Sequence, residues 1–164
     1  MTSRFIHSSP SIDANTWFVD RFGVALPRGL REQAETMDWG QFVTTYGYPS
    51  GCSGPLRLGQ WSRGRTRSLG SCRYRATIAH GDDVRTDTAV ASGPIAAVTA
   101  MLHEHGVTVE TVRFHQMRSG DGHTVTFVCG SDGARTEWAM GWARDATESA
   151  LRAVIGCANR LLAD

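Results

Sequence analysis

Two stretches of the chain place reactive or ligand-binding residue types where a predicted strand runs into a predicted helix. One of them, "VASGPIAA", brings Gly93 and Pro94 to a helix start. The other, "TEWAMGWARDA", contains residues that we assign to ligand binding: Trp138, Met140, Trp142, Arg144, Asp145 and Ala146. Free N–H groups and the positive end of the helix dipole favour a carboxylate at such a start. We therefore predict that a small carboxylic acid or an amino acid binds there, with its side chain among the aromatic residues.

The simpler interpretation of the same residues is structural. Asp145 has the right position to cap its own helix, and the tryptophans have the size of core residues. An amino-acid ligand would also need an anion for its ammonium group, and Asp121 in "SGDG" is the predicted partner. Aspartate is equally common as an ordinary hairpin-turn residue, so that alternative stays open.

The stretch "VRFHQM" supplies two further candidates. Phe114 is a predicted ligand contact, and His115 has a side chain whose charge can change near neutral pH. If the domain is an enzyme, His115 and Asp145 are the predicted catalytic residues. The alternative for His115 is a hydrogen-bonded residue of a sheet.

No metal or cofactor is expected. His103 and His105 in "HEH" lie at a helix end, where positions i and i+2 point to different sides, so we expect both to face solvent. His80, Asp82 and Asp83 are assigned to a solvated hairpin turn. The four cysteines have neither zinc-site nor redox-motif spacing, and we expect them to be reduced.

Charge and hydropathy exclude some partner classes. The net charge of +1 gives no general attraction to nucleic acid, and the basic run between Arg63 and Arg75 is predicted to be a solvated loop and edge strand. No apolar run approaches the roughly 20 residues of a membrane span, and no signal peptide is recognised. We therefore expect a cytoplasmic protein without nucleic-acid or membrane partners.

These residues require a scaffold that repeats. An offset of 50 residues aligns Asp82 with Asp132 and Arg85 with Arg135, within two successive patterns of three strands and a helix. The predicted fold is α+β, with two βββα repeats packed together after a short helical linker segment. The predicted divisions are a disordered N-terminus (1–16), a linker-like segment with two short helices (17–55) and the two-repeat domain (56–164).

Several motifs resemble a known family. "FGVALPRGLR" is similar to the end of the linker region of actinobacterial-type α-isopropylmalate synthases. "ASGPIAAVTAMLHEHGVTVETVRFHQ" and "TEWAMGWARDATESALRAVIGCANRL" resemble the two halves of the C-terminal allosteric domain of those enzymes, which citramalate synthases share. The resemblance implies a non-catalytic domain that dimerises and binds leucine or isoleucine between its βββα units. The metal-binding catalytic barrel of the family has no counterpart in these residues.

Two functional hypotheses follow. In the first, the chain is a free-standing allosteric-type domain, a homodimer that binds a small amino-acid-like ligand and acts in trans on a synthase. In the second, the effector pocket has become the active site of a small biosynthetic enzyme that performs an acid–base isomerisation or cyclisation. A dimerisation module without a ligand is the third possibility.

Overall fold

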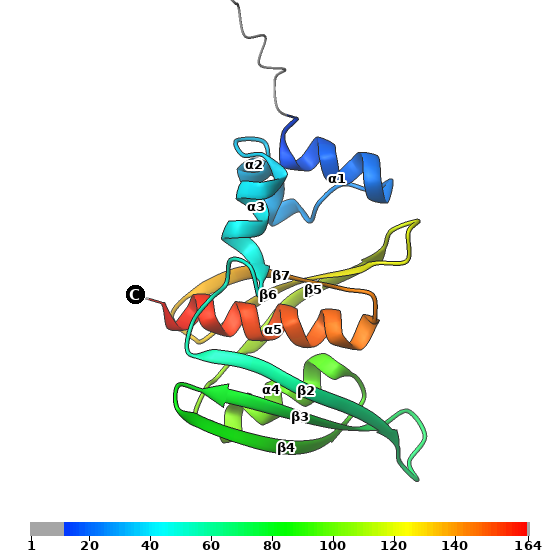
Figure 1. Cartoon of the computed structure of the whole chain (residues 1–164), viewed down its shortest axis with the longest axis vertical. Helices are drawn as coiled ribbons and strands as arrows, with labels where there is room; N and C mark the ends of the chain where they lie inside the picture. Colours follow the sequence, from blue (N-terminus) through cyan, green and yellow to red (C-terminus); the bar gives the residue numbers. More distant parts are fainter. Residues whose placement is uncertain (1–11, 164) are drawn as a thin grey trace, which may run out of the picture.

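The predicted α+β fold is confirmed by the computed structural model, which describes residues 12–163. These residues form five helices and two sheets, a four-stranded sheet in the order β1-β7-β6-β5 and a three-stranded sheet in the order β2-β3-β4 (Figure 1). The elements are α1 (Ala14–Phe22), α2 (Arg28–Ala34), α3 (Trp39–Tyr46), β1 (Gly47–Tyr48), β2 (Leu56–Arg65), β3 (Cys72–His80), β4 (Asp83–Ala91), α4 (Pro94–Glu104), β5 (Glu110–Arg118), β6 (Thr124–Ser131), β7 (Thr136–Ala143) and α5 (Ala146–Leu162).

The N-terminal segment is helical from an earlier point than the sequence suggested. Asp13 caps α1 by accepting the Thr16 N–H, and Gly23 ends it in the left-handed conformation at a φ of 74°. Helix α1 therefore begins at Ala14, ahead of the predicted boundary at residue 16, and it adds a helix to the two that were expected. Residues 1–11 of the predicted disordered segment lie outside the described residues.

The two βββα units have the same internal order. Strands β2, β3 and β4 pair antiparallel and lead into α4, and β5, β6 and β7 pair in the same way and lead into α5. The helices begin at Pro94 and Ala146, so the structural offset between the units at this point is 52 residues rather than 50.

The main core lies between the two sheets, where the helices α4 and α5 are placed (Figure 1). Helix α5 packs on β6 and β7 and also on β2, whereas α4 packs on β3, β4 and α5. Buried residues of both sheets, such as Ile78 and Val128, join Leu102 of α4 and Ile155 of α5 in one cluster. The two units therefore seal each other's apolar faces, as the repeat predicted.

The other face of the β5–β7 sheet is covered by α1, α2 and α3 (Figure 1). Phe18 of α1 and Phe42 of α3 are fully buried against Phe127 of β6. The segment after α3, predicted as a turn or linker, also joins the sheet, because Gly47 and Tyr48 pair parallel with β7. The helical segment and the two-unit domain are thus packed as one body.

No helix within residues 12–163 is long and apolar enough to cross a membrane.

Candidate functional site

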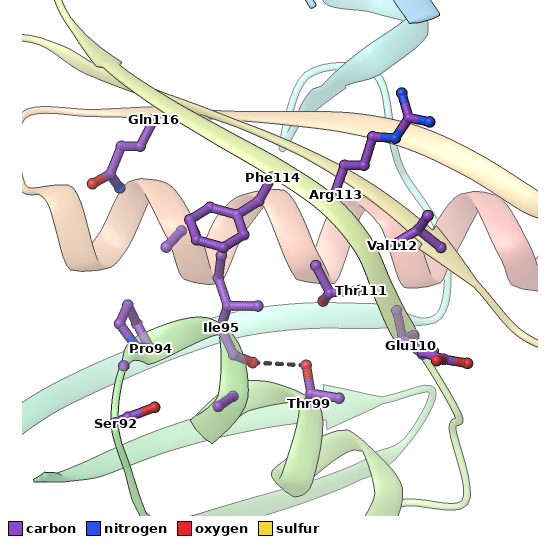
Figure 2. Close-up of a pocket in the computed structure, with 14 residues that line it drawn as sticks. Ser92, Pro94, Ile95, Thr99, Glu110, Thr111, Val112, Arg113, Phe114 and Gln116 are labelled. Carbon is purple, nitrogen blue, oxygen red and sulfur yellow. Dashed lines mark hydrogen bonds between the residues drawn. The ribbon is translucent and has the colours of Figure 1, made fainter.

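A hollow of about 860 Å³ lies between the start of α4 and strand β5, where the two units meet. In Figure 2, Phe114 points from β5 toward Ile95 of α4, while Arg113 points away from the helix. Strand alternation explains the difference, because Phe114 pairs with the core residue Val128 and Arg113 pairs with Cys129 on the opposite face. The hollow therefore contains one of the two predicted helix starts together with Phe114.

The start of α4 is open toward this hollow. Its N-cap residue is Gly93, which has no side chain to accept an N–H, and Pro94 follows as a residue without an N–H. The Ala97 N–H donates to the Gly93 carbonyl at 3.1 Å, but the N–H groups of Ile95 and Ala96 have no acceptor in the described part of the chain. Two donors and the positive helix end are thus available to an anion.

The start of α5 differs from that of α4 because a carboxylate of the chain already accepts its free N–H groups. The Asp145 carboxylate accepts the N–H groups of Thr147 and Glu148, at 2.7 Å and 3.1 Å. This confirms the structural interpretation of Asp145 as a cap. Arg144, Asp145 and Ala146 border a separate, smaller hollow of about 290 Å³ with Arg118 and Gln116 of β5.

The walls of the inter-unit hollow are mostly apolar, with a few polar groups. Ile95, Val112, Phe114 and Ala150 provide the apolar surface, and Val112 and Phe114 are 53% and 57% exposed. The Thr111 hydroxyl oxygen is buried and has no hydrogen-bond partner within residues 12–163. Buried polar groups are normally bonded, so an orphaned hydroxyl at a hollow favours a polar ligand atom or a water there. This combination is typical of a small-molecule site.

The predicted aromatic contacts lie elsewhere. Trp138, Met140 and Trp142 do share one face of β7, but that face packs against α1–α3 and not against α5. The reason is size: Gly141 lies on the α5 side, where an added Cβ would come within 2.0 Å of the Ser149 carbonyl oxygen. Large side chains must therefore take the outer face. The structure thus places these residues away from the start of α5, and their role in ligand binding stays a prediction.

Asp121 is also outside the inter-unit hollow. Its carboxylate pairs with Arg21 of α1 at 2.5 Å and accepts hydrogen bonds from Ser119 and His123. The bonds from Ser119 and His123, followed by the charge of Arg21, hold its pKa well below the usual range. It fastens the β5–β6 hairpin to α1, and its role as an ammonium partner stays a prediction. The acidic residue that lines the hollow is Glu110.

The two predicted catalytic residues do not meet. His115 lies on the outer face of β5, near-parallel to Trp138 with 6.4 Å between the ring centroids, and borders a third hollow. Asp145 lies at the start of α5 and borders the smaller one. The residues that the sequence suggested as one site thus border three different hollows along β5.

Two other expectations concern histidines and cysteines. His105 does not face solvent: it ends α4, and its buried ring contacts the Asp87 carboxylate at 2.7 Å.

Burial raises the pKa of the Cys52 thiol to about 11 and that of Cys157 to about 12, which makes both poor nucleophiles. Within residues 12–163, no three His, Cys, Asp or Glu side chains are grouped so that they could hold a metal ion.

Several wall residues were missed by the sequence analysis. Ile95, Thr111 and Val112 are wall residues that were not among the predicted ligand contacts. Gln116 donates to the Thr126 hydroxyl and to the Ala146 carbonyl, at 2.9 Å and 3.0 Å, and so ties β5 to the start of α5. The available signal was the alternation of β5, which puts Phe114 and Gln116 on one face.

These features define a two-unit βββα domain with a ligand-sized hollow between its units. No protein-family model matches the sequence. The chain is similar to the 2-isopropylmalate synthase of Renibacterium salmoninarum, with 27% identity over 134 residues, which are 77% of this chain and 23% of that enzyme. It is also similar to the 2-isopropylmalate synthase of Arthrobacter sp. strain FB24, with 31% identity over 117 residues, which are 65% of this chain and 20% of that enzyme.

The chain is therefore a domain related to 2-isopropylmalate synthase, and the resemblance stated from its motifs is confirmed. The matched residues span about a fifth of the length of these relatives.

Proposed function

We propose that this domain binds a small amino acid or a related carboxylic acid in the hollow between α4 and β5. The observation that supports the proposal best is the uncapped start of α4, whose free N–H groups open on an apolar hollow. A carboxylate would accept these N–H groups, and an aliphatic side chain would pack on Ile95 and Phe114. Glu110 and the Thr111 hydroxyl are the polar wall groups suited to an amino group.

We extend the proposal to a homodimer that uses strand β5. This strand is the edge of its sheet, and its exposed Val112 and Phe114 form an apolar strip beside the hollow. Unpaired edge strands with apolar side chains tend to associate with another chain. Sedimentation velocity should show a dimer that Val112→Arg dissociates, whereas Val84→Arg, at an exposed position on β4, should not. A monomer at all concentrations would refute this part.

The proposed role is regulatory, and the proposed protein partner is a synthase to which the domain confers a response to the ligand. Its support is the similarity to 2-isopropylmalate synthases, of which the chain covers only a part. The direct check is the feedback response of such a synthase assayed with and without this domain.

Ligand binding is tested by thermal-shift titration of the purified chain with leucine, isoleucine, valine and their 2-oxo acids. A ligand at about 100 times its dissociation constant adds roughly 2.7 kcal/mol, or about 5–10 °C in a chain of this size. Phe114→Ala should reduce the shift, and Val90→Ala, at a similarly exposed position on β4, should leave it unchanged. No shift with any of these compounds, or a full shift in Phe114→Ala, would contradict the proposal.

A further inference from the structure

A different hollow, of about 710 Å³, lies on the outer face of the β5–β7 sheet, between β5 and the stretch from Val24 to Arg31. Its charged lining comes from Arg28 and Arg31 of α2 and from Arg113 of β5, and His115 of β5 lies beside them. No aspartate or glutamate is among its lining residues. In a chain with a net charge of only +1, such an accumulation of one sign is local. A second one lies on the other sheet, where Arg63, Arg73 and Arg75 line a hollow of about 570 Å³.

The arginines of this hollow are not neutralised by other residues. Within residues 12–163, Arg28, Arg31 and Arg113 form no ion pair, although Arg21, Arg135, Arg152 and Arg160 do. The Arg31 Nε donates to the Leu26 carbonyl at 2.6 Å, which fixes the side chain and leaves its terminal nitrogens free for another acceptor. Three cations that face one hollow without a counter-charge repel one another, and an anion between them removes that cost.

The rest of the lining is mostly apolar. Leu26 is fully buried below it, and Trp138 and Met117 complete its wall. The first turn of α2 rests directly on Trp138, because a Cβ on Gly29 would lie 2.6 Å from the indole nitrogen. The three arginines are therefore carried by a helix and a strand and not by a loop.

We propose that this hollow is a binding site for a compact dianion, on the other side of β5 from the inter-unit hollow, with which it shares Arg113, Phe114 and Gln116 as wall residues. Guanidinium groups match the geometry of carboxylate and phosphate oxygens and bind them through paired N–H bonds. Arg28 and Arg31 approach from α2, and Arg113 approaches from β5, so one dianion is contacted from both sides. Binding fastens the helical segment to the edge strand of the sheet.

The test is calorimetric titration of the full chain with succinate and, separately, with inorganic phosphate, against sodium chloride at matched ionic strength. We expect saturable binding of at least one dianion, weakened about tenfold or more by Arg113→Gln or by Arg28→Gln. Arg67→Gln, at an exposed arginine that does not line this hollow, is the matched control and should bind as the parent does. Gly93→Asp should also leave dianion affinity unchanged, because it alters only the inter-unit hollow.

Binding of succinate alone identifies an organic diacid as the ligand class, and binding of phosphate alone identifies a phosphate compound. The proposal is overturned if neither dianion gives saturable binding beyond the chloride control, or if Arg67→Gln weakens binding as much as Arg113→Gln. Circular dichroism of each variant confirms that it is folded, which we expect because all three arginines are exposed.

Discussion

Replacing Gly93 with aspartate gives the start of α4 the same kind of cap that Asp145 gives to α5. The position accepts a side chain, since no atom lies within 4 Å of an added Cβ and the backbone is extended at a φ of −165°. The new carboxylate should accept the free N–H groups of Ile95 and Ala96. A cap of this kind improves on glycine by a few tenths of a kcal/mol, and the helix dipole adds about 0.3 kcal/mol. The melting temperature should therefore rise by about 1–2 °C.

The same substitution should weaken ligand binding. If the ligand carboxylate uses these N–H groups, Gly93→Asp removes a charge-assisted hydrogen bond worth about 1.5–3 kcal/mol. That loss corresponds to roughly tenfold to hundredfold weaker binding. Titration calorimetry with the compound that gives the largest thermal shift measures the change directly.

Gly93→Ala is the matched control, because it adds a Cβ without an acceptor. Its affinity should stay within about threefold of the parent, since the N–H groups remain free. Unchanged affinity in Gly93→Asp would refute the assignment of the carboxylate to the start of α4. Equal losses in both variants would show that bulk at this position matters and that the N–H groups do not.

Three further predictions concern stability and reactivity. Asn159→Ala should cost about 3 kcal/mol in denaturant unfolding, because the buried amide bonds Leu56 N–H and two carbonyls of the 52–56 segment. The lowered pKa of Asp121 means that its charge stabilises the fold above its unfolded pKa of about 4 and that this contribution is lost as the pH falls. The difference in melting temperature between parent and Asp121→Asn should therefore shrink as the pH falls from about 6 to about 3. A thiol reagent should label the half-exposed Cys72 before unfolding and the buried Cys157 only after it.

Much of the fold could be predicted because it depends on local periodicity. Asp38 directly precedes the apolar spacing of Trp39, Phe42 and Tyr46, a pattern that predicts a helix cap, and it caps α3 in a capping box with Gln41. The alternation in "CRYRATIAH" predicts one face for Tyr74, Ala76 and Ile78, and all three are buried on one face of β3. Helix α1 was missed although Asp13 and Gly23 mark its ends, because the polar residues before it suggested disorder.

The site was harder to predict, because alternation shows which side chains share a face but not what covers it. In "WAMGWA" the large residues were assigned to a ligand, yet both faces of the sheet are buried at the neighbouring strand β6. The informative feature was the small set of residues in between: Ala139, Gly141 and Ala143 allow α5 to approach β7 closely. Helix α5 packs on the face of β7 that carries the small residues, so α1–α3 pack on the opposite face, which carries the tryptophans.

The location of the inter-unit hollow follows from a difference between the units that their shared pattern conceals. Helix α5 has 17 residues and reaches β2 of the other unit, whereas α4 has 11 residues and makes its contacts within its own unit and with α5. Six residues correspond to about 9 Å of helix. The inner face of β5 is therefore left without the cover that β2 receives, and this is where Phe114 is exposed. In the proposed function, a ligand in this space bridges α4 and β5, so its binding energy depends on how the two units are arranged. An approximate repeat with one short helix thus supplies both a site and a means of coupling that site to the arrangement of the units.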